Sequence, residues 1–263
     1  MQIGIFYNEN QVAREIVEQY AAEIEKGGGS AVFFSAPEQI WGCDRLIVLG
    51  GDGTVLKAAK AAAPLGIPLF GVNYGRIGFL TEFEKEEREQ AVALALNEAC
   101  PRMRRSMLET TLCGKTHVCL NELALLRGIS PESHNRVEKI TVAVDGTPAG
   151  DYACDGLIVA TPTGSTAYSL SAGGCIMMPD CETFLLTPVC AFSLRSRPIV
   201  FPDTSELTLS LSADDALMAY GDGDFLGVVG EADKLTVKKS ALSAVLLTRN
   251  EHGFFARLSQ KIN

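Results

Sequence analysis

The sequence is poor in the residues that build structural metal sites, and it lacks long apolar or basic runs. Its 263 residues include three histidines and one tryptophan, and none of its eight cysteines belongs to a C-x-x-C pair. A zinc site is therefore not expected, and the sequence assigns no metal ligand. No apolar run is long enough to cross a bilayer. The net charge of −9 argues against a broad nucleic-acid surface, so we expect neither a membrane nor a nucleic acid as a partner.

Two common nucleotide-binding fingerprints are also missing. There is no Walker A lysine pattern, and the glycines between Gly71 and Gly78 do not fit the G-x-G-x-x-G spacing of a dinucleotide fold. Residues 1–7 contain no basic region followed by a long apolar one, so no signal peptide is expected and the predicted compartment is the cytoplasm. In that compartment the cysteines should be unpaired, and most should be buried as small apolar residues.

The first hundred residues alternate between strand and helix patterns. Apolar runs rich in branched residues predict strands, and apolar residues at helical spacing predict helices. Alternating strands and helices predict a parallel sheet, so we expect residues 1–99 to form an α/β domain. The predicted strands are 2–7, 31–34, 45–49 and 68–72, and the predicted helices are 11–26, 54–63 and 84–97.

From about residue 100 the pattern changes to short strands separated by Gly, Pro and Asp turns. This pattern is typical of an antiparallel sandwich or folded sheet. Residues 100–250 are therefore expected to form a mainly antiparallel, β-sandwich-like domain, and residues 251–263 an amphipathic tail that docks back on the N-terminal domain. The predicted strands include 108–112, 118–126, 137–144, 157–160, 207–211, 235–237 and 244–248.

The N-terminal half is organised around a glycine turn, Gly50-Gly51-Asp52-Gly53, which separates an apolar strand from a helix pattern. A strand, a turn and a helix place backbone N–H groups where they can face phosphate. The glycines allow positive φ and let a ligand approach the backbone. A carboxylate would repel phosphate, so Asp52 is interpreted as a base for an attacking hydroxyl or as a metal ligand. The alternative is that Asp52 only caps the helix.

Two stretches of the second half carry polar residues that packing alone does not explain. Asn121 and Glu122 interrupt an apolar strand, and there they need hydrogen-bond partners such as ribose hydroxyls or an adenine edge. Alternatively, they form a hydrated pair on an edge strand. The stretch from Asp155 to Gly174 runs from a strand into a turn rich in Thr, Ser and Gly, which can surround a sugar or a phosphate. Alternatively, Thr163 or Ser165 only caps a short helix.

Together these segments resemble the NAD kinase family in order and approximate spacing, over nearly the whole chain. The glycine turn alone also resembles turns of diacylglycerol-type lipid kinases and phosphofructokinases, so the Thr- and Ser-rich stretch coupled to Asn121-Glu122 is the specific part. The matching segments are Gly50 through Thr54, Gly71-Val72-Asn73, Gly78 through Thr81, Asn121-Glu122, Asp155 through Ser171 and Leu258 through Lys261.

The resemblance implies transfer of a terminal phosphoryl group from ATP or polyphosphate to the 2′-hydroxyl of the adenosine ribose of NAD, giving NADP. It also implies a divalent cation, usually magnesium, a two-domain fold with the active site between the domains, and a homodimer or homotetramer.

The same match implies roles for individual residues. Asp52 is the catalytic base, Gly50, Gly51, Gly53 and Thr54 bind the donor phosphates, and Asp155 reaches the nicotinamide end of NAD. The sequence departs from the family pattern at Ala153, where a basic residue is common, and at Asp224, where an amide is expected. The full set implied for NAD binding is Asp52, Gly53, Asn121, Glu122, Arg136, Asp155, Thr163, Thr166, Ala167, Tyr168, Ser169, Leu170, Ser171 and Asp224.

Two other functions stay open on the sequence alone. One is a kinase that uses the same turn on another hydroxyl, such as a lipid head, although no basic amphipathic stretch for a membrane surface is present. The other is a catalytically silent dinucleotide sensor, which would bind NAD without turnover and would have no need of a base at Asp52.

Overall fold

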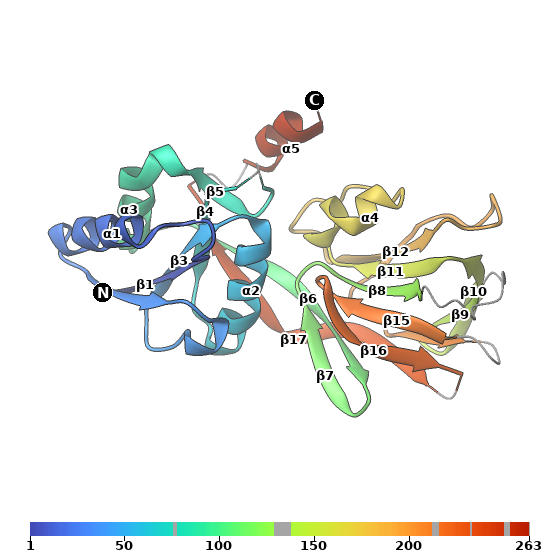
Figure 1. Cartoon of the computed structure of the whole chain (residues 1–263). Helices are drawn as coiled ribbons and strands as arrows, with labels where there is room; N and C mark the ends of the chain where they lie inside the picture. The colour runs from blue at the N-terminus through green and yellow to red at the C-terminus, as the bar shows by residue number, and fades with distance from the viewer. Residues whose placement is uncertain (76–77, 129–137, 212–215, 232, 250–252, 263) are drawn as a thin grey trace. The chain divides into compact units, whose positions relative to one another are not determined.

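The computed structural model describes residues 1–75, 78–128, 138–211, 216–231, 233–249 and 253–262 (Figure 1). The chain divides into two compact units. The first contains residues 1–105 and 242–263, and the second contains residues 106–241. Two long strands, β6 (Arg102–Leu112) and β17 (Lys234–Leu247), each contribute residues to both units.

The first unit is built on a parallel sheet with the strand order β2–β1–β3–β4. On its free side β4 pairs in parallel with β5 and with the end of β17. The strands are β1 (Gln2–Tyr7), β2 (Ser30–Phe34), β3 (Arg45–Gly50), β4 (Leu69–Asn73) and β5 (Thr81–Glu84). The helices are α1 (Arg14–Lys26), α2 (Asp52–Ala62), α3 (Arg88–Leu96) and α5 (Phe254–Ile262), with 3-10 turns at Pro37–Gln39, Ala63–Leu65 and Lys85–Glu87.

Helices on both faces of this sheet explain why its strands are apolar throughout. Ile47 and Leu49 of β3 pack in one core with α1 and α3. On the opposite face, a Cβ built on Gly71 of β4 would lie 2.6 Å from the side chain of Val55 in α2. The sheet therefore has α1 and α3 on one face and α2 on the other (Figure 1).

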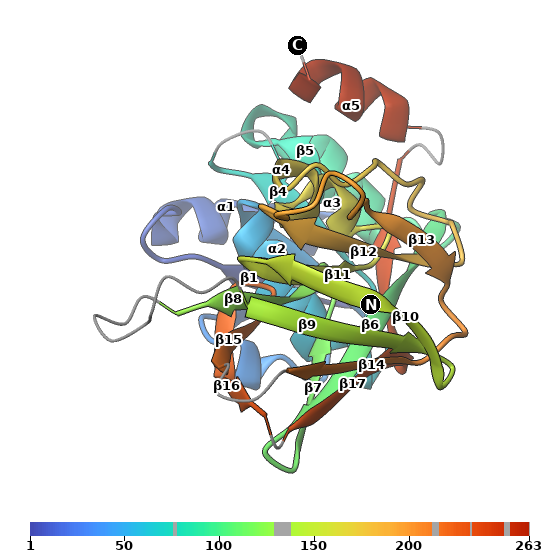
Figure 2. The same ribbon diagram turned by 90° about the vertical axis from the view of Figure 1, so that its right-hand side faces the viewer.

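The second unit contains two antiparallel sheets. One has the order β13–β12–β11–β8–β15–β16, and Figure 2 shows β11, β12 and β13 side by side. The other has the order β10–β9–β14–β17, with β6 paired to β17 and β7. The remaining strands are β7 (Lys115–Cys119), β8 (Glu122–Arg127), β9 (Glu138–Val144), β10 (Thr147–Cys154), β11 (Gly156–Ala160), β12 (Thr183–Val189), β13 (Ile199–Pro202), β14 (Leu207–Leu211), β15 (Ala216–Gly221) and β16 (Asp224–Gly230).

The two sheets of this unit share one core, as in a sandwich. Leu123 and Leu125 of β8 pack with Val142 of β9 and Leu209 of β14. Because side chains alternate along a strand, Ala124 of β8 lies on the outer face, in a smaller cluster covered by the connection from β11 to β12. The predicted fold class, a parallel α/β domain followed by a mainly antiparallel sandwich, is confirmed.

Two sequence predictions about local structure are wrong, and one strand was not predicted. The predicted helix 84–97 corresponds to a 3-10 turn followed by α3. The strand before it, β5, was not predicted, and its Phe83 is buried against Phe70 in the sheet. The predicted strand 118–126 is interrupted between β7 and β8. All eight cysteines are free, but only four are buried, namely Cys43, Cys100, Cys119 and Cys154.

Candidate active site

The glycine turn joins β3 to α2 in the first unit, and β3 is buried along its whole length. Gly50 is required by packing, because a Cβ there would lie 2.4 Å from Thr54 Oγ1. A Cβ at Gly51 or Gly53 would meet no atom within 4 Å. None of the three glycines uses the positive φ that glycine allows, and Gly51 has φ −97°. Glycine at 51 and 53 therefore leaves bare backbone facing open space, which suits the approach of a ligand.

Asp52 is directed toward a second segment of the chain. Its Oδ2 accepts a hydrogen bond from Phe79 N–H at 2.7 Å, and its Oδ1 accepts one from Leu80 N–H at 3.0 Å. Gly51, and not Asp52, occupies the N-cap position of α2. The alternative that Asp52 only caps the helix is therefore wrong. Each carboxylate oxygen can accept two hydrogen bonds, so these amide contacts are compatible with a role in accepting a further proton.

A cavity of about 480 Å³ lies beside the turn and is lined in part by Gly51, Gly53 and Thr54. It is also lined by Asn8, which follows β1, and by Ser35, which follows β2. In this sheet β2 and β3 lie on opposite sides of β1. The cavity thus lies beyond the carboxyl ends of the strands at a topological switch point, where open α/β sheets bind ligands.

Lys57 adds a positive charge to this cavity. It lies one helical turn after Gly53 on the same face of α2, and its side chain is exposed. The sequence interpretation missed Lys57, Asn8 and Ser35 as site residues. The positions of Asn8 and Ser35 just after predicted strands were a usable signal, because ligands gather at those strand ends.

Asn73 connects the turn to the second glycine-rich segment. It ends β4 opposite Gly50 and is 3% exposed. Its Nδ2 donates to Glu84 Oε2 at 2.9 Å, and its Oδ1 accepts from Gly75 N–H at 3.0 Å. Asn73 therefore fixes the beginning of the segment whose later amides bind Asp52. Arg76 and Ile77 of this motif lie outside the described residues.

In the second unit, Asn121 and Glu122 lie at the beginning of β8. This strand runs between β11 and β15, in the middle of its sheet. The two residues are 8% and 7% exposed. The alternative that they form a hydrated pair on an edge strand is therefore wrong.

Asp222 holds the backbone at this point. Its carboxylate accepts N–H groups from Leu120 at 2.9 Å, Asn121 at 2.7 Å and Glu122 at 3.2 Å, and its own N–H donates to Glu122 O at 3.0 Å. These bonds replace strand pairing and explain the interruption between β7 and β8. Asp222 and Gly223 have φ of 51° and 85°, as the two-residue turn of a β15–β16 hairpin requires. Asp222 is not among the site residues expected from the sequence, although its carboxylate organises the site.

Glu122 lies where its neutral form is favoured. Burial first, and the nearby charge of Asp222 second, raise its pKa to about 8, while a hydrogen bond from Tyr168 N–H opposes the shift. Glu122 Oε2 and Asn121 Oδ1 are buried and have no hydrogen-bond partner among the described atoms. Unpartnered buried polar atoms are uncommon in native proteins. Two of them on consecutive residues fit a ligand that brings hydroxyl or amino groups.

The Thr- and Ser-rich connection packs directly against this pair. Thr161 donates its hydroxyl to Leu120 O at 2.5 Å and its N–H to Asn121 O at 2.8 Å. A Cβ at Gly164 would lie 2.1 Å from Asn121 O. Only glycine permits so close an approach, so the absence of a side chain at Gly164 lets the connection pack against the start of β8.

The connection continues as a 3-10 turn (Gly164–Thr166) and one turn of helix, α4 (Tyr168–Ser171). Ser165 is fully buried, donates to Pro162 O at 2.7 Å and accepts from Met177 N–H at 3.0 Å. Thr163 precedes the 3-10 turn without a side-chain cap bond. The alternative that either residue is only a helix cap is wrong.

Tyr168 and Ser169 differ sharply in exposure. Tyr168 is 38% exposed, whereas Ser169 is fully buried and its hydroxyl lies 2.8 Å from Thr187 Oγ1. Tyr168 therefore offers a ring surface to a ligand, and Ser169 fastens α4 to β12. The predicted NAD-binding residues gathered around β8 are Asn121, Glu122, Thr163, Thr166, Ala167, Tyr168, Ser169, Leu170 and Ser171.

Five predicted NAD-binding residues are not part of this group. Asp52 and Gly53 belong to the turn at the start of α2 in the first unit. Asp155 precedes β11, which is five residues long, so the strand separates it from the Thr- and Ser-rich connection by about 17 Å. It is exposed and lies 3.8 Å from Arg127 Nη1. Asp224 is exposed at the first position of β16. Arg136 lies outside the described residues.

The described ranges contain no group of three or more His, Cys, Asp or Glu side chains arranged to hold a metal ion. Nor does the described part of the chain contain a helix that is both long and apolar enough to cross a membrane.

Two family models match the sequence. The model described as the ATP-NAD kinase N-terminal domain matches residues 30–99, and the model described as the ATP-NAD kinase C-terminal domain matches residues 120–248. An NAD kinase of Desulforamulus reducens is 38% identical over 226 residues, which cover 84% of this chain and 77% of that protein. NAD kinase 2 of Synechocystis sp. is 33% identical over 291 residues, which cover 99% and 94%.

Solved structures are similar over the whole chain. The crystal structure of an NAD kinase from Archaeoglobus fulgidus in complex with ATP superimposes with a TM-score of 0.83 at 26% identity, covering 100% of this chain and 98% of that one. Yeast NADH kinase complexed with NADH superimposes with a TM-score of 0.89 and covers 100% and 87%. Its identity is 22%, so that likeness concerns the fold.

Proposed function

The chain belongs to the NAD kinase family and phosphorylates NAD to NADP, and we propose that it takes the phosphoryl group from ATP with Asp52 as the base. The observation that carries this proposal is the glycine turn. Its backbone is bare at Gly51 and Gly53. Asp52, the residue between them, carries a carboxylate that does not cap the helix. A phosphate cradle with an adjacent proton acceptor suits phosphoryl transfer to a hydroxyl.

In the proposed reaction the 2′-hydroxyl of the adenosine ribose gives its proton to an Asp52 carboxylate oxygen. The ribose oxygen forms a bond to the terminal phosphorus of ATP, the bond from that phosphorus to the bridging oxygen breaks, and ADP leaves with the bond electrons. The hydrogen bonds from Phe79 and Leu80 N–H orient the carboxylate. Orientation matters because phosphoryl transfer depends mainly on positioning and on neutralising charge.

For NAD, we propose binding by the group of residues around β8. The unpartnered oxygens of Asn121 and Glu122 would accept hydrogen bonds from the ribose hydroxyls or the adenine amino group. The exposed ring of Tyr168 would stack on a base. Asp155, at the far end of β11, is proposed for the nicotinamide end of the same molecule.

For the donor, the cavity beside the turn favours ATP over polyphosphate. Backbone amides bind only the phosphate groups of a donor, so the turn itself does not distinguish ATP from polyphosphate. The adjoining cavity of about 480 Å³ is within the size range of small-molecule sites and has room for a nucleoside. Lys57 at its edge would offset donor charge. The NAD kinase of Archaeoglobus fulgidus, crystallised in complex with ATP, supports this choice.

Magnesium is proposed as the divalent cation. Proteins commonly bind Mg²⁺ through one or two carboxylates together with substrate phosphates. Asp52, beside the proposed phosphate cradle, supplies one such carboxylate, so the residues present fit a cation that enters with the donor. When bound it would neutralise charge on the transferred phosphoryl group.

The first test is NADP formation by the purified protein with NAD and magnesium, given ATP or polyphosphate separately. We expect product with ATP. Product with polyphosphate alone would overturn the donor assignment, whereas NAD binding by calorimetry without product would favour the silent sensor. A Gly51→Ala variant sharpens the test, because its Cβ meets no neighbour and its backbone angles suit alanine. We expect it to keep its Tm and to raise KM for ATP about tenfold.

We also propose a homodimer or homotetramer. Phe192 and Leu194 are 81% and 85% exposed, and Val200 on the edge strand β13 is 48% exposed. Exposed apolar residues at a sheet edge are typical of an interface. Light scattering should give at least a dimer at micromolar concentration, and Phe192→Ser with Leu194→Ser should weaken it. A monomeric wild type would reject this proposal.

A cytoplasmic location is proposed as well. The eight free thiols suit a reducing compartment, where disulfides are rare. Fractionation of cells that express the full-length protein should find it in the cytoplasmic fraction.

A further inference from the structure

The segment that orients Asp52 is short and is continuous with an edge strand. Phe79 and Leu80, whose N–H groups bind the carboxylate, are followed directly by β5. The approach is close, since a Cβ at Gly78 would lie 1.8 Å from Asp52 Oδ1. Any displacement of β5 along or away from β4 would therefore move the two amides against Asp52.

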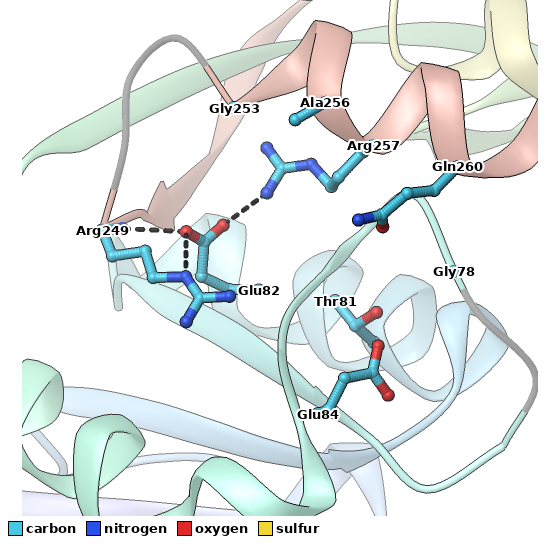
Figure 3. A pocket seen from close by; sticks show the side chains of 9 residues that line it. All are labelled: Gly78, Thr81, Glu82, Glu84, Arg249, Gly253, Ala256, Arg257 and Gln260. Atoms are coloured by element: carbon cyan, nitrogen blue, oxygen red, sulfur yellow. Dashed lines mark hydrogen bonds and ion pairs between the residues drawn. The ribbon is translucent and has the colours of Figure 1, made fainter.

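Glu82, the second residue of β5, is held by the end of the chain (Figure 3). Its Oε1 accepts hydrogen bonds from Thr248 Oγ1 at 3.0 Å and from Arg249 N–H at 2.9 Å. Its Oε2 accepts one from Arg257 Nη1 of α5 at 2.8 Å. The Glu82 side chain is only 7% exposed, so these partners take the place of the water molecules that would bind an exposed carboxylate. Both carboxylate oxygens are thus occupied by residues that follow β17.

The arginines are themselves fixed. Arg249 forms an ion pair with Glu87 and lies over the Phe83 ring at 4.7 Å. Arg257 belongs to α5, in which Phe254 is 8% exposed. Arg257 and Gly78 also line one cavity of about 250 Å³, so the helix and the Asp52-binding segment border the same space.

We propose that Arg257 and Glu82 are positioning residues for Asp52: the docked helix α5 fixes β5, and β5 fixes the Phe79 and Leu80 amides that aim the carboxylate. This inference rests on the proposed role of Asp52 as the base. Neither residue touches a reacting atom in this account. Their contribution is to kcat, because a misaligned base lowers the rate of proton transfer without removing a contact to NAD or ATP.

The test compares Arg257→Ala, Arg257→Lys and Glu82→Gln with an Arg88→Ala control. Arg88 forms an ion pair of similar length, 2.6 Å to Glu23, which is more exposed, ties α3 to α1 and does not lead to Phe79. We expect Arg257→Ala to lower kcat by about 10- to 100-fold with KM for NAD and ATP nearly unchanged. Arg257→Lys should restore part of kcat, and Arg88→Ala should lower Tm but not kcat. If Arg257→Ala does not fold, Glu82→Gln serves, since it keeps the shape and the Thr248 contact.

A double-mutant cycle with Asp52→Asn identifies the route of the effect. If Arg257 acts through Asp52, Arg257→Ala should have little further effect on kcat once Asp52 is replaced. An equal loss in both backgrounds, a full kcat in Arg257→Ala, or an equal loss in Arg88→Ala would overturn the inference. A fully active Asp52→Asn enzyme would instead reject the proposed base, so the two failures are distinct.

Discussion

At the scale of single residues, Asp52 combines a fixed position with a proton acceptor. Asp52→Asn keeps the shape but removes the negative charge and one acceptor. We expect kcat to fall by about 10²- to 10⁴-fold, the range typical of a lost general base. The dissociation constant for NAD should change little, because the group of residues around β8 is untouched. Steady-state kinetics and calorimetry measure the two quantities, and a nearly normal kcat would rule out Asp52 as the base.

Glu122 makes stability depend on pH in a defined direction. Its pKa is about 8 in the folded protein against an ordinary value of 4.5. Between these values the folded protein keeps a proton that the unfolded chain has released, so this residue lowers the free energy of unfolding as pH rises from about 4.5 to about 8. Glu122→Gln removes that dependence. The free energy of unfolding of the variant, relative to that of wild type, should increase by a few kcal/mol between pH 5 and pH 8.5.

Urea denaturation at the two pH values measures this difference. Parallel curves for wild type and Glu122→Gln would show that Glu122 is ionised in the folded protein, contrary to its burial beside Asp222.

At the scale of elements, a substitution in the turn into α2 should change stability and activity in opposite directions. Gly53 lies in the first turn of α2, where a Cβ meets no neighbour, so Gly53→Ala should raise the free energy of unfolding by about 0.5 kcal/mol. We expect kcat/KM for ATP to fall about tenfold nevertheless, because the methyl group occupies the proposed path of the phosphates.

Gly50→Ala is the matched control in the same turn. Its Cβ would lie 2.4 Å from Thr54 Oγ1, so stability and activity should fall together. A Gly53→Ala protein that is more stable and fully active would mean that the donor phosphates do not lie against this backbone.

At the scale of the whole molecule, the proposed cation belongs to the reaction and not to folding. Chelation with EDTA should abolish turnover, and added magnesium should restore it. The Tm without substrates should stay the same, because the described residues hold no cluster of metal-ligating side chains that folding could depend on. Calorimetric scans with and without EDTA test this, and a large drop in Tm would point to a structural metal.

Much of the site was readable from the sequence because its motifs are local. Gly50, Gly51, Gly53 and Asp52 lie within four consecutive positions, so the strand-turn-helix geometry follows from the order of residues alone. Local reasoning failed where a distant partner decided the structure. Phe83 draws residues 81–84 into a strand, and Asp222 interrupts the strand expected at 118–126.

The sequence by itself determined the fold class, the NAD kinase family and the strand-turn-helix order around Asp52, because apolar periodicity and contiguous motifs record which residues are neighbours along the chain. Only the tertiary structure decided which groups those side chains bind. Asp52 meets Phe79 across 27 positions, Asp222 meets Asn121 across 101, and Arg257 meets Glu82 across 175. Hydrogen bonds at such separations depend on where folded elements bring their ends, which no local pattern specifies.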